Sequence, residues 1–449
     1  MNECVVLHDV RVIDPCAGTD KVSDLSIIDG LLVNAVPNAQ EGYVHVDCRG
    51  LVACPTFIDV HCHLRQPGLE DKETVRTGTR AAAAGGFGTV CCMPNTRPPM
   101  DTVENISTLL DIVRKDGVVE VLPFGTVTVG RLGREVADLE GLAAAGVVGF
   151  SDDGDYVLDS CVMRDALVRA AELQLPIIDH AQDGGLVQGG VMSQGVVSER
   201  LGVQGMPPEA EDLAVCRDIE LSRMTGAHVH IAHITTGRAV EMVRRAQDEG
   251  LKVTAEATPH HLVLTDECAS VEGPSGTSVF NNQAKVNPPL RCAADTAAVV
   301  RGLADGVICA IATDHAPHTM SNKQGSPEEA AFGISGFETA LGLVLKLYHE
   351  GTVGLPRLVH ALTSGGAGIL RLSDSRVSMP EDGLVNLTLF DPDLIWTVNS
   401  ALFFSKGKNT PVDGWNLRGK VLATFALGKC VHVDEALRSR CTGGDITSQ

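Results

Sequence analysis

The stretch LVACPTFIDVHCH, residues 51–63, is almost continuously apolar and ends in two histidines. An unbroken apolar run is typical of a strand that helices cover on both faces, as they cover parallel strands. Because side chains alternate along an extended chain, His61 and His63 project to the same side. The stretch therefore predicts a buried parallel strand over 51–60, with a pair of imidazoles at its carboxyl end.

Seven similar apolar runs follow, separated by segments with helical patterns. The runs cover residues 89–93, 119–127, 147–150, 176–179, 228–233, 252–257 and 307–313. Helices are predicted over 74–84, 207–224, 237–249 and 293–305, each with a glycine close behind it to supply a left-handed cap. Eight alternations of strand and helix predict an α/β fold, a closed (β/α)₈ TIM barrel. A doubly wound open sheet is the alternative, but no glycine-rich phosphate loop is evident after an early strand.

The two ends of the chain have a different pattern. Short stretches of alternating polarity occupy residues 5–12 and 25–33, and similar stretches return at 384–390, 396–398 and 419–432. Such stretches, broken by turn residues, are typical of β-hairpins. We expect residues 1–54 and 381–436 to form one small β-domain, with the barrel, residues 55–380, inserted between them. Residues 437–449 are polar and are expected to be a flexible tail.

The composition argues against several classes of partner. The 57 acidic residues outnumber the 36 basic ones, and a net charge of −21 argues against a nucleic-acid partner. No apolar run reaches about 18 residues, and the first residues lack the pattern of a signal peptide, so no membrane contact is expected. The 14 cysteines contain no CxxC pair, which favours reduced thiols and a cytoplasmic location.

Groups that bind metals recur where the predicted strands end, which is where active sites of TIM barrels form. They are Asp59, His61, His63, Asp152, Asp153, Asp179, His180, His230, His233, Asp314 and His315. A single histidine is more often a packed or surface residue than a ligand. The recurrence at five of the eight strand ends nevertheless favours a common site. Imidazole combined with carboxylate suits Zn²⁺, and an incomplete protein shell leaves room for an activated water.

The same residues lie within motifs of a known family. FIDVHCHLRQPG (57–68), MPNT (93–96) and FSDDG (150–154) are followed by TPHHL (258–262), KVNPPLR (285–291), TDHAPH (313–318) and SKGKNTP (405–411). In these motifs, which extend over nearly the whole chain, the sequence resembles the amidohydrolase superfamily. The closest resemblance is to the dihydroorotases of the bacterial class that has a bridging aspartate.

The resemblance implies a centre of two Zn²⁺ ions per chain, of which the second can be bound more weakly. The implied ligands are His61, His63 and Asp314 for one ion, His180 and His233 for the other, and Asp153 as the bridge. A hydroxide between the ions would be the nucleophile, because two cations lower the pKa of the water that they share. Asp314 would act as general acid and base and carry a proton to the leaving amide nitrogen.

The resemblance also implies a substrate and a reaction. The reaction is the reversible conversion of N-carbamoyl-L-aspartate to L-dihydroorotate and water in de novo pyrimidine biosynthesis. Arg65 would grip the carboxylate of the substrate through two charge-assisted hydrogen bonds. The complete set of implied substrate contacts is His63, Arg65, Asn95, Asn287, His318 and the backbone around Phe332 and Gly333.

Two other functions remain open. A hydantoinase, dihydropyrimidinase or allantoinase shares the barrel and the two metals, but typically has a carboxylated lysine as the bridge, and residues 146–155 contain no lysine. Substrates of those enzymes also need no clamp such as Arg65. A catalytically inactive scaffold subunit of a transcarbamoylase is expected to lose metal ligands, whereas all six are present here. A homodimer and an association of an active enzyme with aspartate transcarbamoylase are both compatible with the sequence.

The chain departs from the family pattern in two places. Gln182 follows His180 where relatives often have glutamate, which puts the contacts that support His180 in doubt. Residues 266–283 form a lengthened polar segment, either a lid or a tolerated insertion. The other histidines are interpreted as supporting, structural or exposed residues. They are His260 and His261, which can support the site, and His8, His45, His349, His360 and His432.

Overall fold

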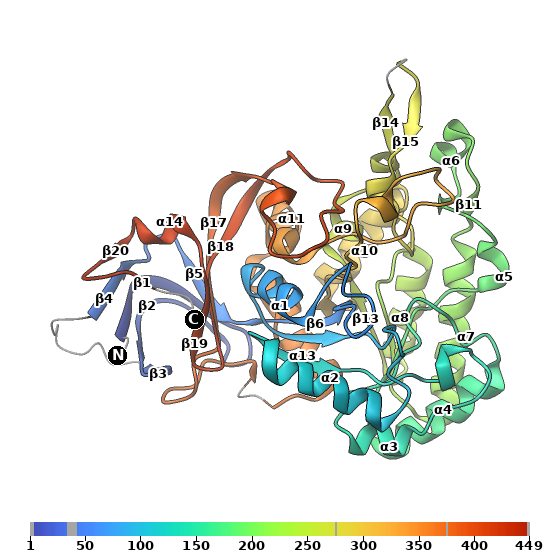
Figure 1. Cartoon of the computed structure of the whole chain (residues 1–449), viewed down its shortest axis with the longest axis horizontal. Coiled ribbons are helices and arrows are strands. Elements are labelled where there is room, and N and C mark those ends of the chain that lie inside the picture. The colour runs from blue at the N-terminus through green and yellow to red at the C-terminus, as the bar shows by residue number, and fades with distance from the viewer. Residues whose placement is uncertain (1–3, 34–42, 274–275, 374–375, 447–449) are drawn as a thin grey trace.

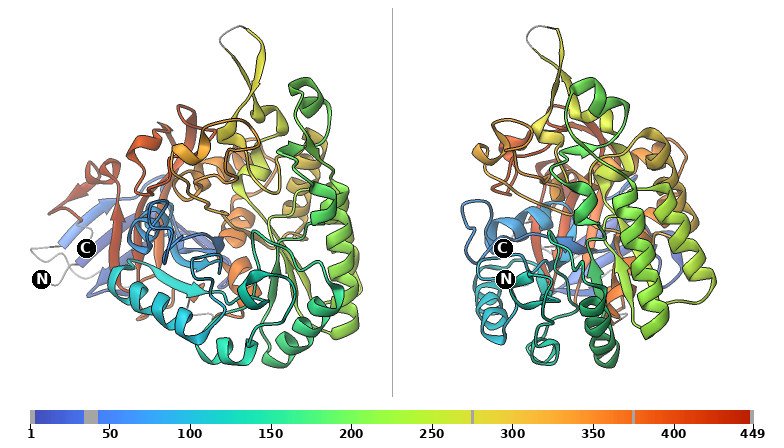
Figure 2. Two further views of the ribbon diagram at one scale, coloured as in Figure 1. Left: turned by 45° about the vertical axis from the view of Figure 1, so that its right-hand side comes forward. Right: turned by 90° about the vertical axis from the view of Figure 1, so that its right-hand side faces the viewer.

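The computed structural model describes residues 4–33, 43–273, 276–373 and 376–446. Figure 1 shows a barrel of strands surrounded by helices on the right and a second sheet, rich in antiparallel pairs, on the left. Figure 2 shows the same arrangement from two further sides, with the green helices in a row along the outer face of the barrel. No helix in the described part of the chain has both the length and the apolar character that a membrane crossing needs.

Eight extended segments close the barrel. They are β6 (Phe57–Cys62), β7 (Phe87–Cys92), β8 (Glu120–Pro123), a short segment at Phe150, β9 (Ile177–Asp179), β12 (Val229–Ile231), β13 (Val253–Ala257) and β16 (Ala310–Ile311). Parallel pairing joins β6 to β7 to β8, and β9 to β12 to β13 to β16. Single bridges link Phe150 to Gly125 and Ile177, and a bridge from Cys62 to His315 closes the ring. The predicted TIM barrel is confirmed, although described residues 147–150 form single bridges instead of a strand.

Helices surround the barrel. The longer ones are α1 (Val75–Ala84), α2 (Val103–Asp116), α4 (Ser160–Leu173), α7 (Glu209–Thr225), α8 (Gly237–Asp248), α10 (Ala293–Asp305), α11 (Ala340–His349), α12 (Leu355–Leu362) and α13 (Ser364–Leu370). The four predicted ones, α1, α7, α8 and α10, begin and end close to the predicted positions. Thr74 caps α1, because its hydroxyl accepts a hydrogen bond from the amide of Thr77. Gly226 and Gly306 end α7 and α10 in the left-handed conformation, as predicted.

Short elements lie in the connections. They are α3 (Leu139–Ala144), α5 (Gly184–Val187), α6 (Val196–Leu201), α9 (Pro259–Val263) and the strand pairs β10 (Met192–Ser193) with β11 (Gly205–Met206) and β14 (Ser270–Glu272) with β15 (Ser278–Phe280). In Figure 1 the β14–β15 hairpin projects beyond the rest of the molecule.

Strands from both ends of the chain form one sheet, the β-domain sheet. Its strands are β1 (Cys4–Asp14), β2 (Thr19–Ile28), β3 (Leu31–Val33), β4 (Tyr43–Asp47), β5 (Val52–Pro55), β17 (Leu387–Thr397), β18 (Asn416–Ala426), β19 (Lys429–Val433) and β20 (Cys441–Thr442). The order is β19-β18-β17-β5-β1-β2-β3, with β4 paired to β1 and to β20. The prediction that both chain ends join in one β-domain is confirmed.

The first predicted strand is wrong in its extent. Residues 51–60 hold two strands, β5 and β6, because the chain passes from the β-domain sheet to the barrel at Thr56. Leu51 and Ala53 pack in the core of the β-domain, whereas Val52 and Cys54 pack in the core of the barrel. The two faces of β5 are thus buried in two different cores, so both faces are apolar. Residues 51–60 are therefore a continuous apolar stretch, which resembles one long strand when only the sequence is considered.

The predicted flexible tail also needs correction. Within residues 437–446, Leu437 is fully buried at the end of α14 (Glu435–Arg438), and β20 pairs antiparallel with β4. Ile446 is buried as well. Apolar burial and strand pairing therefore attach this part of the chain to the β-domain, and residues 447–449 lie outside the described residues.

Candidate active site

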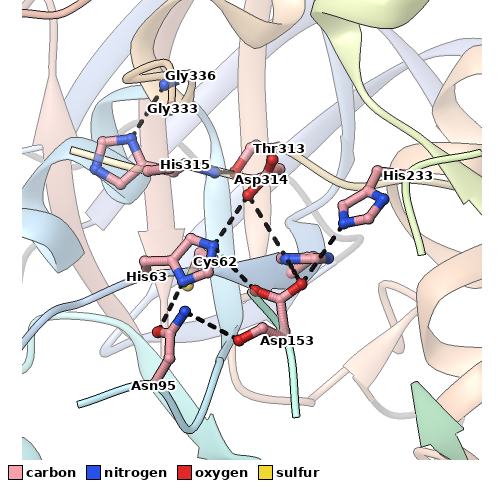
Figure 3. Close-up of polar contacts among 12 residues, drawn as sticks. Cys62, His63, Asn95, Asp153, His233, Thr313, Asp314, His315, Gly333 and Gly336 are labelled. Atoms are coloured by element: carbon pink, nitrogen blue, oxygen red, sulfur yellow. Dashed lines mark hydrogen bonds and ion pairs between the residues drawn. The ribbon is translucent and has the colours of Figure 1, made fainter. Parts of the chain in front are cut away.

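The predicted ligands and substrate contacts meet where the carboxyl ends of the barrel strands converge. Figure 3 shows several of them, among them His63, Asp153 and Asp314. A cavity of about 240 Å³ opens there, and all seven predicted substrate contacts line it. Five of the six predicted metal ligands line it too, and the sixth, His61, is fully buried next to Asp153. The lining consists of His63, Arg65, Asn95, Asp153, Gly154, His180, His233, Asn287, Asp314, Ala316, His318, Phe332 and Gly333.

His61, His63 and Asp314 form one group of donor atoms. His61 and His63 come from the end of β6, and Asp314 comes from the segment that follows β16. Oδ1 of Asp314 lies 3.6 Å from Nε2 of His61 and 3.0 Å from Nε2 of His63. These three residues are the set predicted for the first ion.

His180, His233 and Asp153 form a second group. Nδ1 of His180 lies 2.9 Å from Nε2 of His233, and each nitrogen lies 3.5 Å from Oδ1 of Asp153. Asp153 also faces the first group, since its Oδ1 lies 3.3 Å from Nε2 of His61 and its Oδ2 3.5 Å from Nε2 of His63. The carboxylate therefore lies between the two groups, as a bridging ligand must.

The arrangement fits divalent metal ions of the zinc type. Donor atoms bound at about 2.0–2.2 Å around a tetrahedral zinc lie about 3.3–3.6 Å from one another, which is close to most of the distances above. Nε2 of His61 and Oδ1 of Asp153 are buried and have no hydrogen-bond partner among the residues that the structure describes. Because an unpaired buried polar atom is costly, these two atoms are suited to ligate a cation.

Contacts among the ligands shift their pKa values. Burial by itself raises the pKa of Asp153, but the surrounding imidazoles of His61, His180 and His233 lower it well below the ordinary range. Burial lowers the pKa of His61, yet Asp153 and Glu256 raise it well above its ordinary value. The carboxylates are thus ionised at neutral pH and need positive charge beside them. A divalent cation supplies that charge, and its binding releases the proton that His61 carries.

Glu256, near the carboxyl end of β13, orients His61. Its Oε1 lies 3.0 Å from Nδ1 of His61, and its Oε2 lies 3.1 Å from Nε2 of His230. Burial raises the pKa of Glu256, but the bonds to His230 and His61 lower it to about 2, so the carboxylate is charged. It accepts from Nδ1 of His61 and leaves Nε2 free to face the metal group. Sequence reasoning missed this residue, although a carboxylate inside the apolar run 252–257 was the available signal.

Arg65 provides a cation without an anionic partner at the wall of the cavity. Burial lowers the pKa of its guanidinium to about 10, which leaves it charged at neutral pH. Its Nε donates to the carbonyl of Pro317 at 3.3 Å, and its Nη2 lies 3.4 Å from Nε2 of His318. Among the described residues it forms no ion pair, and its polar side-chain contacts are those to Pro317 and His318. Nδ1 of His318 is buried, with no hydrogen-bond partner in the described part of the chain. These two groups are suited to receive an anionic substrate, because burying an unpaired charge is otherwise unfavourable.

Known proteins share both the motifs and the fold. A family model described as "Dihydro-orotase-like" matches residues 50–239. A dihydroorotase from Geobacter sp. (strain M21) is 43% identical over 424 residues, which are 94% of this chain and 97% of the relative. A dihydroorotase from Solibacter usitatus (strain Ellin6076) is 40% identical over 426 residues, 94% of this chain and 97% of the relative. The chain belongs to the dihydroorotase family.

Solved structures agree with the dihydroorotase family in architecture. L-hydantoinase from Arthrobacter aurescens superposes with a TM-score of 0.82 at 22% identity, over 96% of each chain. Dihydropyrimidinase from Brevibacillus agri NCHU1002 also gives 0.82, at 20% identity over 97% of this chain and 96% of that chain. At such low identity these likenesses show the fold alone, a barrel with an attached β-domain.

In this member of the dihydroorotase family, residue 182 is glutamine where relatives often have glutamate. Gln182 still contacts and supports His180. Its Oε1 lies 3.3 Å from Nε2 of His180, so Nδ1 of His180 is left to face Asp153. The amides of Gln182 and Asn287 also donate to each other at 3.0 Å in both directions. A neutral amide therefore supports His180 and orients Asn287 at the same time.

The remaining predicted residues lie around the site. His63 receives support from Asn95, whose Oδ1 lies 3.0 Å from Nδ1 of His63. His261 bonds to the hydroxyl of Thr258 and to the carbonyl of Pro288, so it holds the loop that carries Asn287. Arg131, which sequence reasoning also missed, donates to the carbonyl of Asp153 at 2.7 Å. Its position after the third predicted strand gave no distinctive signal.

Proposed function

We propose that this cavity catalyses the reversible cyclisation of N-carbamoyl-L-aspartate to L-dihydroorotate and water, the ring-forming step of de novo pyrimidine biosynthesis. The observation that carries the proposal is Arg65, a buried cation without an ion-pair partner among the described residues, on the wall of the cavity. Two groups of potential metal ligands lie beside it, His61 with Asp153 and His233, and His61 with His63 and Asp314. Both substrates carry a carboxylate that does not react, and a guanidinium matches that group.

We further propose two Zn²⁺ ions per chain. One ion would be bound by His61, His63 and Asp314. The other would be bound by His180 and His233, and Asp153 would bind both ions. When bound, such ions supply an ionised water at neutral pH and polarise the carbonyl that is attacked. Because Asp153 takes the bridging position, added bicarbonate should not change activity, and Asp153→Ala should remove the binuclear site.

The protein side chains then bind the substrate and move a proton. Arg65, Asn95 and the free Nδ1 of His318 would hold the carboxylate, which orients the ring or the open chain over Asp153. Asn287 and the backbone around Phe332 and Gly333 would hold the amide groups. Asp314, which lines the cavity, is the general acid and base: it would take a proton when the ring opens and return it to the leaving nitrogen.

A hydantoinase or dihydropyrimidinase function is less well supported, since residues 146–155 contain no lysine to carboxylate and those substrates lack the anion that Arg65 would bind. A cytoplasmic location, a homodimer and docking to an aspartate transcarbamoylase stay predictions from the sequence. Measuring the molecular mass of the purified protein in solution tests the homodimer. The same measurement on a mixture with aspartate transcarbamoylase tests the docking.

An assay of the purified protein with dihydroorotate, dihydrouracil, hydantoin and allantoin, together with metal analysis, tests the proposal. We expect strong preference for dihydroorotate and up to two divalent ions per chain. Ring closure should be favoured at lower pH, because it consumes a proton. Equal turnover of dihydrouracil, or an equilibrium that does not depend on pH, would contradict the substrate assignment.

A further inference from the structure

Asn409 is fully buried next to the cavity, although it does not line it. It belongs to the SKGKNTP motif, residues 405–411, in the connection between β17 and β18 of the β-domain sheet. This connection leaves the β-domain and contacts the loops at the mouth of the barrel. The proposed chemistry assigns no function to it.

The side-chain amide of Asn409 bonds at once to two segments, residues 316–318 and 333–335, of the long connection between β16 and α11, which also pair with each other where the amide of Ala316 donates to the carbonyl of Ile334. Its Oδ1 accepts hydrogen bonds from the backbone amide of His318 and from the hydroxyl of Ser335, both at 2.9 Å. Its Nδ2 donates to the carbonyls of Ala316 and Gly333, both at 3.0 Å. Both donor hydrogens and the acceptor oxygen of this amide are therefore used, and no other side chain of similar size offers two donors and an acceptor.

Neighbouring residues hold the SKGKNTP motif close to the same two segments. A Cβ atom on Gly407 would lie 2.5 Å from Cβ of Pro317 and from Oγ of Ser335, so only glycine permits this approach. The hydroxyl of Ser405 donates to the buried carboxylate of Glu73. The motif is thus fixed at two points just before Asn409, which leaves the amide little freedom to find other partners.

The two segments that Asn409 joins form part of the carboxylate pocket. The carbonyl of Pro317 accepts from Nε of Arg65 at 3.3 Å, and the next residue, His318, contacts Nη2 of Arg65. Gly333, in the second segment, lines the cavity beside His318. Displacement of either segment would therefore turn the Arg65 guanidinium or change the width of the pocket.

We infer that Asn409 is a positioning residue that sets the geometry of the Arg65 carboxylate pocket from the β-domain. The inference rests on the proposed function and deepens it, because it assigns part of the substrate specificity to a residue outside the barrel. Since the metal ligands do not contact Asn409, binding of substrate should depend on it far more than metal content or the chemical step.

Steady-state kinetics with dihydroorotate test this. Asn409→Asp keeps the size of the side chain but replaces the Nδ2 donor with an oxygen that faces two carbonyls. We expect KM to rise about tenfold while kcat changes much less and metal content stays at the wild-type level. Asn399→Asp is the matched control: it lies in the same connection and accepts only from the amide of Ala401, a bond that aspartate preserves.

A double-mutant cycle separates positioning from general damage. In an Arg65→Ala background the clamp is already absent, so Asn409→Asp should have little further effect on kcat/KM. Asn409→Ser, whose hydroxyl is too short to reach all four partners, gives the same KM readout if Asn409→Asp is not recovered folded. An unchanged KM in an active enzyme, a parallel loss of metal, or full additivity with Arg65→Ala would overturn the inference. Absence of dihydroorotate turnover by the wild type would instead contradict the proposed function.

Discussion

Three residues of the candidate site adopt an unfavourable backbone conformation. Arg65, His233 and Asp314 have φ angles of 63°, 33° and 44°, in the left-handed region that costs roughly 1–2 kcal/mol for a residue other than glycine. Surrounding bonds impose this conformation. Asp59, for example, accepts from the amides of His61 and Thr313, and so fixes the two strand ends that carry the first group of ligands. The strain is thus local to the chemistry and is offset by the packing of the barrel around it.

The residue-scale prediction concerns Arg65. Arg65→Ala should lower kcat/KM for dihydroorotate by tens to thousands of fold, because loss of a buried partner of a charge costs about 2–5 kcal/mol. Arg65→Lys should also be impaired, since an ammonium lacks the planar fork. Metal content should not change, because Arg65 is not a ligand.

Arg97→Ala is the control for this prediction. Arg97 follows the second barrel strand much as Arg65 follows the first, but its side chain is exposed and does not line the cavity. The control should keep wild-type kinetics. Intact turnover of dihydroorotate by Arg65→Ala would leave only a general cyclic-amidase function.

At the scale of elements, the lengthened segment 266–283 contains the β14–β15 hairpin, which projects away from the barrel (Figure 1). None of the described residues of this segment lines the cavity, and Val271 and Val279 are 43% and 41% exposed. The amide of Asn281 donates to the carbonyl of Ala269 at 2.8 Å, so the base of the hairpin is closed by its own hydrogen bond. These features favour a tolerated insertion over a lid.

We predict that replacing residues 270–280 with a short glycine linker leaves kcat/KM for dihydroorotate at the wild-type level. The reason is that Ala269 and Asn281 already lie side by side, so the cavity walls stay in place. Kinetics and metal analysis of the shortened chain check this. A large fall in kcat with metal retained would show that the hairpin closes over the substrate.

A second element-scale prediction concerns Glu338, in the short 3₁₀ turn Phe337–Thr339 before α11. Its carboxylate accepts from the amide of Phe404 at 2.7 Å, and burial raises its pKa from the ordinary 4.5 to about 8. The folded chain therefore holds a proton that the unfolded chain has released. The stability that this proton provides is fully present below about pH 4.5 and is lost as pH rises through about 8.

Urea unfolding at several pH values tests the effect of Glu338. The free energy of unfolding of the wild type should fall between pH 5 and pH 9 relative to that of Glu338→Gln, because glutamine keeps the acceptor without a charge. Glu350→Gln serves as the control, because Glu350 lies in the same region but is exposed. This substitution removes a negative charge that is not buried. Parallel curves for wild type and Glu338→Gln would contradict the raised pKa.

At the scale of the whole molecule, the barrel brings buried carboxylates and imidazoles together inside a strongly acidic protein. Asp153 and Asp314 are both buried and both ionised, so the folded state contains like charges that a cation would neutralise. Metal binding and folding should therefore be linked, because an ion that binds only the folded chain stabilises it.

We predict that removing metal with a chelator abolishes turnover and lowers the melting temperature, and that added Zn²⁺ restores both. His180→Ala should lose one of two ions and His61→Ala the other, with smaller shifts in melting temperature than complete removal. Calorimetry combined with metal analysis measures these changes. Metal-free protein with full activity would refute the metal-dependent mechanism.

Much of this arrangement could be read from local patterns in the chain. The apolar runs predicted the barrel strands, and histidines and aspartates just beyond them predicted a common metal site, because strand burial and side-chain alternation depend on neighbours only a few residues away. The division of these residues into two ligand groups came from the resemblance to dihydroorotases. Arg65 and Gly226 were predictable from their local position. Three contacts between distant residues were not predictable: the division of 51–60 between two cores, the pairing of Glu256 with His61, and the contact of Asn409 with two segments of the connection after β16. They arise only when the barrel closes between Cys62 and His315, and closure depends on packing summed over the whole chain rather than on any local pattern.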